Sequence, residues 1–596
     1  MMHKNIKPTP PLPVSWEECK ERGWTSLDVL LVTGDAYIDH PSFGIALIGR
    51  LLESHGYKVA ILSQPRFDSA VDFKSYPAPK LFCGITAGNL DSIVANYTGN
   101  GKVRISDSYS PDGNPWRGTT KEKKERRRPD RATLIYTSLA RSAYGKVPLV
   151  LGGLEGSLRR FVHFDYKQNK LRASFLTDAK ADLLVYGMGE KAVIELARRC
   201  TEDLPLTAIP GTCIRVTDNE LGELFDEHEI LQPRRFLKLP SLEEILQDKS
   251  LFLEAEIETD KHLRAYSPRI ILQRQQTHWV IQYPEFSPLQ PDELDALYTL
   301  PYTRKPHPPE QRIPAHQMIK DSVTIVRGCS GNCSFCSITR HQGPAIVSRS
   351  RQSIVKECKT IAKSAGFSGT ISDLGGPTAN LYGTSCAIGT CKKKDCLYPQ
   401  MCTHLRIDED LFLQLLTDVA NIEEVKHLFI SSGLRMELLL KAPRLMERII
   451  TSHTPGSIKI APEHSDPETL RLMHKEPHSL LEEFVKKCRQ IATKHKKKNV
   501  ELTPYVISSH PGSAPECNVQ LVSDMKKLNL SIRKFQDFTP TPGSLSTAMY
   551  VSEIDPETKK KITVSKGQAE RLRARKIIEQ EFHKENFRPK RNKKKP

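Results

Sequence analysis

The first two hundred residues alternate short apolar runs with amphipathic segments. Apolar residues recur at helical spacing from about residue 41 to 55, where Gly56 follows, and a second helix is expected over residues 191–199. The apolar runs, which predict buried strands, lie at residues 29–32, 58–62, 81–85, 147–151 and 183–186. This alternation predicts an α/β domain over residues 1–200, with a Rossmann-like, doubly wound parallel sheet.

Two glycine turns follow strands of this predicted sheet. Gly152 and Gly153 come after one strand, and Gly187 and Gly189 come after another. Both turns would lie at the carboxyl edge of the sheet, where ligands usually bind. Neither turn is a full GxGxxG motif, so tight packing turns explain them equally well.

The pattern becomes less regular at residues 201–312, which we interpret as a bridging region with a helix at about 242–256. Alternation then resumes over residues 313–550. Six strands are predicted there, at residues 322–326, 369–372, 428–431, 457–460, 502–507 and 535–539. Six βα units predict a partial (β/α)6 TIM-like barrel, with the active site at the carboxyl ends of its strands. Residues 551–596 form a basic tail.

Composition and charge restrict the class of protein. The chain has 596 residues and a formal net charge of +18, and neither a signal-like start nor a membrane-length apolar run is present. We therefore expect a soluble, cytoplasmic protein that contacts no membrane. Much of the positive charge lies in short runs, which are usually solvated, although such a surface could also bind RNA. No recognisable nucleic-acid-binding module accompanies the charge.

Three closely spaced cysteines are the strongest chemical signal in the chain. Cys329, Cys333 and Cys336 have the spacing C-x3-C-x2-C and directly follow a predicted strand that Gly328 breaks. Three thiolates can bind three irons of a 4Fe-4S cubane, which leaves the fourth iron open to a small molecule. The alternatives are a zinc site with His341 as fourth ligand, or three unrelated thiols. Zinc sites usually present C-x2-C pairs together with a distant second pair, and this loop has no such second pair.

This cysteine loop resembles that of the radical SAM superfamily. In those proteins the open iron binds the amino and carboxylate groups of S-adenosylmethionine (SAM), and reduction releases a 5′-deoxyadenosyl radical. The protein contributes position and a protected cavity.

Residues after later strands are candidates for contacts with SAM. Gly375 and Gly376 match the superfamily's glycine-rich turn, although Pro377 replaces the usual acid. Ser432 and Arg435 would suit the ribose hydroxyls and the carboxylate, and Glu463 would suit ribose or amine groups. Ordinary polarity at a barrel mouth is the alternative for each of these side chains.

A second group of cysteines follows the glycine turn. Cys386, Cys391, Cys396 and Cys402 lie within one short loop, with lysines 392–394 between them. The lysines could offset the negative charge of a four-thiolate cluster. This second candidate metal site fits an iron–sulfur cluster and zinc equally well by ligand count, and free or partly paired thiols are the alternative. Of the 14 cysteines, eight fall between Cys329 and Cys402, which indicates metal rather than a disulfide framework.

Long motifs make the whole chain resemble the YgiQ family of uncharacterised radical SAM proteins. They are VTGDAYIDHPSFG (32–44), RRPDRAT (127–133), GGLEGSLRR (152–160), CSFCSIT (333–339), DLGGPTAN (373–380), IAPEH (460–464) and FTPTP (538–542). The resemblance implies a 4Fe-4S cluster on Cys329, Cys333 and Cys336, bound SAM and a partial barrel. An external electron donor such as flavodoxin or ferredoxin is also expected. The resemblance implies no defined reaction, because the family's substrate is not established.

The N-terminal domain is similar in outline to cobalamin-binding domains that precede other radical SAM barrels. Those often use a D-x-H-x-x-G loop whose histidine binds cobalt. Here Asp39 and His40 are adjacent, which departs from that spacing, so we do not expect cobalamin.

Two functions from different classes follow from these patterns. The first is a radical SAM enzyme that acts on an unidentified small molecule, RNA or protein. The alternative is a zinc-stabilised nucleic-acid-binding protein without radical chemistry. No catalytic acid or base can be assigned while the substrate is unknown.

Overall fold

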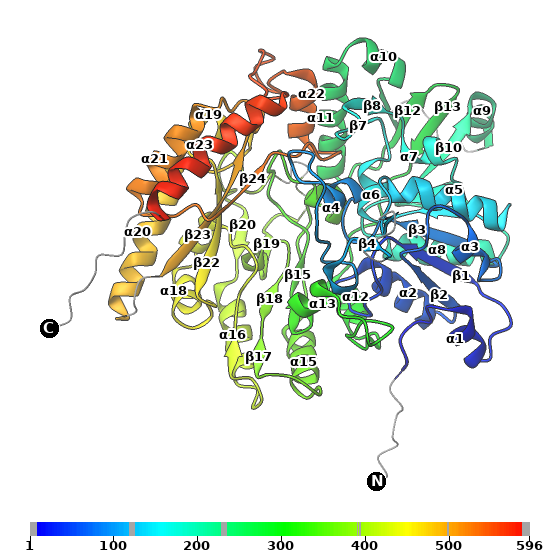
Figure 1. Ribbon diagram of the computed structural model, residues 1–596, viewed down its shortest axis with the longest axis horizontal. Helices are drawn as coiled ribbons and strands as arrows, with labels where there is room; N and C mark the ends of the chain where they lie inside the picture. The colour runs from blue at the N-terminus through cyan, green and yellow to red at the C-terminus, as the bar shows by residue number, and fades with distance from the viewer. Residues whose placement is uncertain are drawn as a thin grey trace, which may run out of the picture.

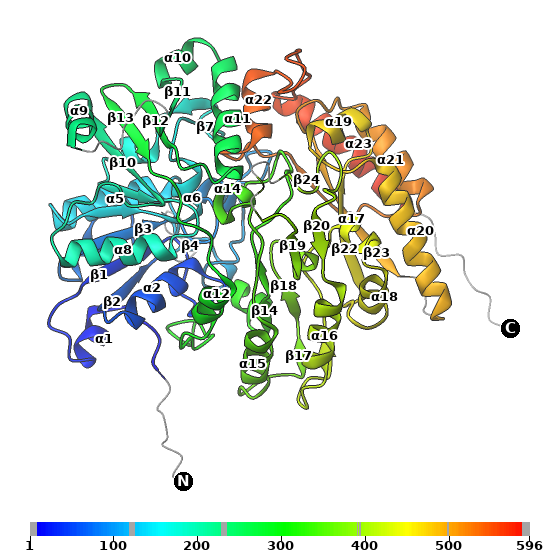
Figure 2. The ribbon, with the colours of Figure 1, turned by 180° about the vertical axis from the view of Figure 1, so that it is seen from behind.

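The computed structural model describes residues 9–118, 125–227, 235–389, 391, 395–496 and 500–586. The chain forms two halves that lie side by side (Figure 1). The N-terminal half is built around one large sheet, and the C-terminal half contains several short parallel strands with helices outside them (Figure 2). No helix in the described ranges combines the length and apolar character needed to cross a membrane.

Five parallel strands form the centre of the N-terminal half. They are β1 (Val29–Thr33), β2 (Val59–Ser63), β3 (Phe82–Thr86), β6 (Leu149–Leu151) and β9 (Leu183–Val185). Their order across the sheet is β2-β1-β3-β6-β9, and every neighbouring pair is parallel. The prediction of a parallel sheet over the first two hundred residues is therefore confirmed.

Helices cover both faces of this sheet because successive residues of a strand point to opposite sides. Leu31 of β1 packs in one core with α2 (Gly44–Ser54) and α8 (Glu190–Thr201). Its neighbour Leu30 packs in a second core with α5 (Ala132–Tyr144). The continuous apolar runs of the sequence thus reflect strands that are buried on both faces.

Four further strands extend the same sheet beyond β9. They are β10 (Thr212–Thr217), β11 (Phe236–Leu239), β12 (Ile270–Gln275) and β13 (His278–Gln282). β10 runs antiparallel to β9 and β13, and β12 runs antiparallel to β13. The region that we interpret as a bridge therefore contributes strands to the N-terminal sheet, while the domain limits stay a prediction.

The helix expected at residues 242–256 is divided into two. α10 (Leu242–Gln247) ends where Asp248 adopts an extended backbone conformation. The Asp248 carboxylate then accepts a hydrogen bond from the Ser250 N–H at 2.8 Å, and α11 (Ser250–Arg264) begins. An aspartate in this position competes with the helical backbone, which explains the break. α11 packs along α22 (Leu545–Ser552) and so joins the two halves.

Each of the six strands predicted for the C-terminal half overlaps a strand of the structure, although the segment predicted at residues 428–431 is a strand only at Leu428. They are β14 (Ser322–Thr324), β17 (Thr370–Ile371) with β18 (Asp373–Gly375), β21 (His427–Leu428), β22 (Ser457–Glu463), β23 (Glu501–Ser508) and β24 (Lys534–Asp537). β14 pairs with β18, β17 pairs with β21, and β22, β23 and β24 form one sheet, all in parallel. Among the described residues no strand pairing joins β21 to β22, so these pairings do not by themselves establish a six-stranded barrel.

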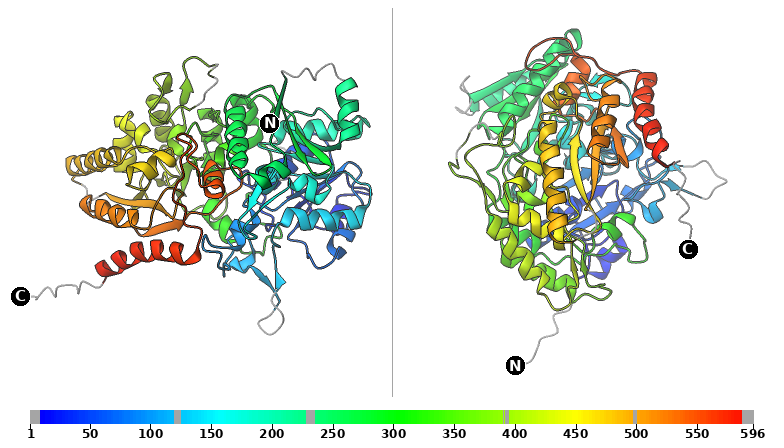
Figure 3. Two further views of the ribbon diagram at one scale, coloured as in Figure 1. Left: turned by 90° about the horizontal axis from the view of Figure 1, so that it is seen from above. Right: turned by 90° about the vertical axis from the view of Figure 1, so that its left-hand side faces the viewer.

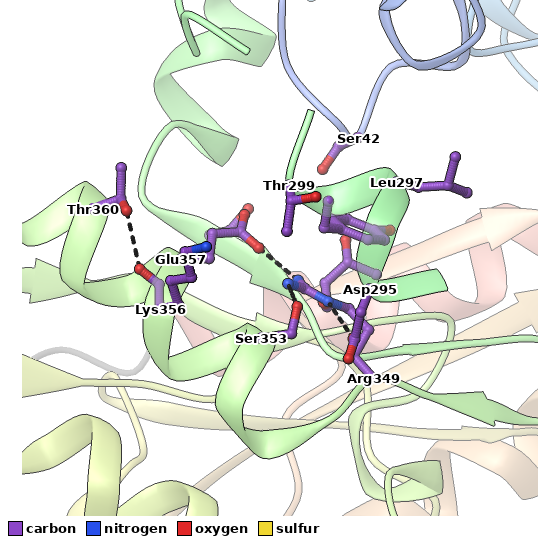
Figure 4. Close-up of polar contacts among 12 residues, drawn as sticks. Ser42, Asp295, Leu297, Thr299, Arg349, Ser353, Lys356, Glu357 and Thr360 are labelled. Atoms are coloured by element: carbon purple, nitrogen blue, oxygen red, sulfur yellow. Dashed lines mark hydrogen bonds and ion pairs between the residues drawn. The ribbon is translucent and has the colours of Figure 1, made fainter. Parts of the chain in front are cut away.

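A buried arginine fastens the connecting helix α12 (Pro291–Tyr298) to α15 (Arg351–Ala362), as Figure 4 shows. Arg349 is 2% exposed, and its guanidinium donates to the Glu357 carboxylate and to the Ser353 hydroxyl. It also lies 4.1 Å from the centre of the Tyr298 ring. The helix that leads into the C-terminal half is thereby held against α15.

The basic tail also packs against the rest of the chain. α23 (Gln568–Asn586) lies on the outside of the C-terminal half (Figure 3). Near its start, Arg571 donates to the carbonyls of Gly99 at 2.8 Å and Phe538 at 2.7 Å, which links the two halves. Residues 587–596 of the predicted tail lie outside the described residues.

We predict that Arg349→Met lowers the free energy of unfolding by about 3–5 kcal/mol, because Glu357 would lose one partner of a buried pair. Arg351→Met is the matched control. Arg351 forms an ion pair with Asp418 in which both side chains are about 40% exposed, so its loss should cost less than about 1 kcal/mol. Urea denaturation midpoints measure both effects, and equal shifts would contradict the prediction.

Candidate functional site

The three cysteines lie on one compact loop between β15 (Val326–Arg327) and α14 (Ile338–Gln342). Gly328 enters the loop with a φ of +77°, and a Cβ atom there would collide with the Ala345 carbonyl. Within the loop, the Cys336 N–H donates to the Cys333 carbonyl at 3.1 Å. Glycine is needed at the entry because both the backbone angle and the available space exclude a side chain.

A buried arginine lies beside the thiols. Arg435, which precedes α17 (Met436–Leu440), places Nη1 3.8 Å from Cys333 Sγ. Burial raises the pKa of the Cys336 thiol to about 12 and also raises that of Cys329, whereas the Arg435 charge lowers the pKa of Cys329. A cation next to these thiols favours their charged form, which is the form that binds metal. The sequence suggested that Arg435 would bind a carboxylate, and the structure brings it to the cysteines.

Three polar residues that the sequence did not single out anchor the loop to the C-terminal elements. The Ser334 hydroxyl donates to the Leu472 carbonyl at 2.7 Å and lies 2.8 Å from the Ser546 hydroxyl. His510 Nε2 lies 2.7 Å from the same Ser546 oxygen. Burial lowers the pKa of His510 to about 3, so this imidazole is neutral at physiological pH. Their separation along the chain, with Ser546 212 residues beyond Ser334, left no local signal for this contact.

Close protein contacts account for both glycines of the predicted turn after β18. A Cβ atom on Gly376 would lie 2.6 Å from the Val326 carbonyl oxygen. One on Gly375 would collide with the Asp373 carboxylate and the Ser432 hydroxyl. The turn therefore packs directly against the strand that leads into the cysteine loop.

Asp373 organises the turn from which Ser432 projects. Its carboxylate accepts hydrogen bonds from the backbone N–H groups of Ser431 at 2.7 Å and Ser432 at 3.0 Å, and from the Ser432 hydroxyl. Burial raises the pKa of Asp373, and these hydrogen bonds lower it. The motif DLGGP contains this aspartate, but the sequence directed attention only to the glycines.

Glu463 has a strained backbone conformation near the end of β22. Its φ is +63°, at an irregularity in the pairing of β22 with β23. Burial raises the pKa of Glu463 to about 7, and the Lys475 charge lowers it. The Glu463 charge in turn raises the pKa of Cys336, so the two groups lie within electrostatic reach of each other.

A cavity of about 860 Å³ lies where the two halves meet. Its size falls within the range of about 300–1,000 Å³ that is typical of small-molecule sites. The C-terminal half contributes Cys336, the predicted glycine turn and Ser432, and the N-terminal half contributes the carboxyl edge of its sheet. Glu463 is not among the lining residues. The lining residues from the N-terminal sheet edge include Thr33, Asp35, Thr86, Gly88, Gly152, Gly153 and Gly187.

The histidines that the sequence considered as metal ligands have other partners. His341 lines the cavity, and its Nδ1 lies 3.2 Å from the Ser157 hydroxyl. His40 is buried and its Nδ1 accepts from the Ser42 N–H at 3.1 Å. His40 does not line the cavity, although Ser42 does. Within the described ranges, no three histidine, cysteine, aspartate or glutamate side chains are arranged around a single metal ion.

The second group of cysteines is also gathered by the fold. β19 (Thr384–Cys386) and β20 (Leu405–Ile407) pair in antiparallel fashion at the base of the loop. The Cys402 N–H donates to the Cys396 carbonyl at 2.8 Å. Burial raises the pKa of Cys396, and the charges of the other three cysteines add to this effect, which brings the pKa to about 11. Lysines 392–394, which the sequence suggested as counter-charges, lie outside the described residues.

Comparison with known proteins identifies the class and then the family. The chain matches the Radical SAM N-terminal family over residues 11–322 and the Radical SAM superfamily over residues 323–506, so it is a radical SAM protein. It is also 44% identical over 566 residues to a UPF0313 protein of Thermotoga neapolitana, covering 93% of this chain and 96% of the relative. The chain belongs to this family, UPF0313 or YgiQ, which confirms the predicted family. Membership implies a 4Fe-4S cluster and SAM.

Solved structures of low identity share the fold. The radical SAM methyltransferase TsrM from Kitasatospora setae, with its tryptophan substrate and a SAM analogue bound, is 13% identical and gives a TM-score of 0.51. That match covers 93% of this chain and 89% of TsrM. TsrM with cobalamin and a 4Fe-4S cluster gives 14% identity and a TM-score of 0.48, covering 87% of this chain and 77% of TsrM. That score is too low to carry an argument.

These comparisons support neither the expectation about cobalamin nor the nucleic-acid-binding alternative. The expectation that cobalamin does not bind is not supported by these comparisons and stays a prediction. Nothing in the comparisons favours the zinc-stabilised nucleic-acid-binding alternative.

We predict that Asp373→Asn lowers the free energy of unfolding by about 1–3 kcal/mol, because an amide nitrogen would face a donor that the carboxylate now satisfies. Asp410→Asn is the control, since Asp410 is 66% exposed in its ion pair with Arg444. Urea denaturation of both variants tests this. A loss no larger than that of the control would show that the carboxylate does not organise the turn.

Proposed function

We propose that the protein is a radical SAM enzyme whose reaction takes place in the cavity between its halves. Cys329, Cys333 and Cys336 would hold the 4Fe-4S cluster, at the cavity that Cys336 lines. When bound and reduced, the cluster supplies one electron to SAM, which divides into methionine and a 5′-deoxyadenosyl radical. The observation that carries the proposal is one cavity shared by a cluster cysteine, the glycine turn and the carboxyl edge of a parallel sheet.

The glycine turn and Ser432 would hold SAM against the open iron. The Gly375 carbonyl already accepts from the Ile325 N–H at 2.8 Å, so we assign the SAM ammonium to the Gly376 carbonyl. The Ser432 hydroxyl donates to Asp373, which leaves its lone pairs to accept from an ammonium or a ribose hydroxyl. Glu463 lies off the cavity wall, so we assign it to the charge balance beside the cysteine loop rather than to direct contact with SAM.

The N-terminal half would bind the unidentified substrate. Ligands of parallel α/β sheets bind outside the carboxyl ends of the strands, and that edge faces the cavity here. Asp35 lines it and is held by the Asn89 N–H at 2.7 Å and by Arg128. Burial raises the pKa of Asp35 to about 6, with the Arg128 charge opposing this. A hydrogen-bonding group at this depth would orient a polar substrate toward the radical.

Two further features complete the proposal. A partial (β/α)6 barrel accounts for the order of the strands from β14 to β24, in which each successive predicted strand is followed by a helix. An external protein such as flavodoxin or ferredoxin would supply the electron, because the chemistry requires a low-potential donor.

We predict that Cys336→Ser abolishes release of 5′-deoxyadenosine from SAM in anaerobically reconstituted, dithionite-reduced protein. The loss should exceed about 100-fold, because the thiolate is a direct ligand of the iron. Cys517→Ser is the control, as this half-buried thiol lies on α21 (Cys517–Lys527), outside both cysteine sets. Chromatography of the nucleoside product measures both, and full turnover by the Cys336 variant would refute the assignment.

We predict that Gly376→Ala weakens SAM binding at least about tenfold while iron content is retained, because the turn must move away from Val326. Gly433→Ala is a matched control: an added Cβ at Gly433 would meet nothing within 4 Å. Equilibrium dialysis of labelled SAM under anaerobic conditions compares the two. Equal affinities would place SAM elsewhere in the cavity.

A further inference from the structure

The four cysteines of the second set have no part in the proposed reaction. Three of them belong to a well-ordered framework: Cys386 ends β19, and Cys396 and Cys402 are joined by a backbone hydrogen bond of 2.8 Å. Cys396 is half-buried and packs against the core of the C-terminal half. Cys386 pairs with Leu405 across β19 and β20, and the Leu405 N–H donates to the Cys402 carbonyl at 3.1 Å, so the fold brings Cys386 and Cys402 to the same end of the loop. Thiolates gathered in this way repel each other unless a metal neutralises them.

This loop is also attached to the loop of the first cysteine set. The Asp395 carboxylate accepts from the Asn332 side-chain N–H at 2.9 Å, and Asn332 lies between Cys329 and Cys333. The Tyr398 ring stacks on the His474 ring with centres 4.6 Å apart. His474 Nδ1 lies 2.9 Å from the Asn332 carbonyl. Asp395 therefore contacts Asn332 of the first loop directly, and Tyr398 contacts it through His474.

We propose that Cys386, Cys391, Cys396 and Cys402 bind a second iron–sulfur cluster, separate from the one on the first cysteine loop. Four thiolates are the full ligand set of a 4Fe-4S cluster, so this cluster would have no open iron for SAM. Its role would be to fix Asp395 and Tyr398, and through them Asn332.

The arrangement of the thiols favours a cluster over a single zinc ion. A structural zinc draws its four ligands around one point at about 2.3 Å, and usually uses C-x2-C pairs. The spacing here is C-x4-C-x4-C-x5-C, which contains no C-x2-C pair.

Metal analysis of a full-length variant that lacks the first site tests this proposal. Cys329→Ala, Cys333→Ala and Cys336→Ala are combined, and the protein is purified and reconstituted without oxygen. We expect about four irons and four sulfides per chain to remain, as one 4Fe-4S cluster requires. Adding Cys396→Ala and Cys402→Ala should remove them, whereas adding Cys200→Ala, on α8 of the other half, should not. One zinc per chain, or no metal, would overturn the proposal.

A second measurement covers failure of the triple variant to fold. In the otherwise unchanged chain, Cys396→Ala with Cys402→Ala should lower the iron content by half, from about eight to about four per chain. Iron that stays unchanged would overturn the proposal. Because both measurements count iron rather than turnover, they are independent of SAM cleavage: a chain could keep the second cluster and still release no 5′-deoxyadenosine.

Discussion

A buried ion pair fixes how the two halves of the molecule face each other. Arg327, directly before the cysteine loop, donates to the Glu190 carboxylate at 2.6 Å, and Glu190 directly follows the turn at Gly187 and Gly189. Both side chains are almost fully buried. Removing either partner would leave a charge without compensation in a region of low polarity, which makes the arrangement hard to vary. This contact holds the turn at the sheet edge next to the strand that leads into the cysteine loop.

The same principle governs the surroundings of the cysteine loop, where several charges are buried together. Arg435 contacts Cys333 and pairs with Glu437, and Lys475 pairs with Glu476 at 2.9 Å. In a poorly polarisable interior such charges act strongly on one another. A cluster with thiolate ligands would therefore enter a site whose cations are already positioned by acidic partners. The need for these charges explains why residues from several parts of the C-terminal half surround the loop.

Local patterns predicted the elements well where burial on both faces produced continuous apolar runs, as in β1, β2 and β9. They failed where one polar residue changed the local outcome, as at Asp248, which divides one expected helix into α10 and α11. The glycine turn was predicted at the correct position, but the sequence did not give the reason why glycine is needed there. Gly376 is required by the nearby Val326 carbonyl, a contact between residues 50 positions apart that no local pattern records.

The sequence by itself determined that this is a radical SAM protein, because the spacing of cysteines within one short loop is a local property of the chain. It also determined the parallel sheet, since the hydrophobic period of a segment depends only on that segment. The tertiary structure decided which residues share the cavity, why Arg435 faces Cys333 from 102 residues away, and that Glu463 is not among the residues that line the cavity. These depend on how separate elements pack together, and packing of distant elements leaves no periodic trace in the sequence.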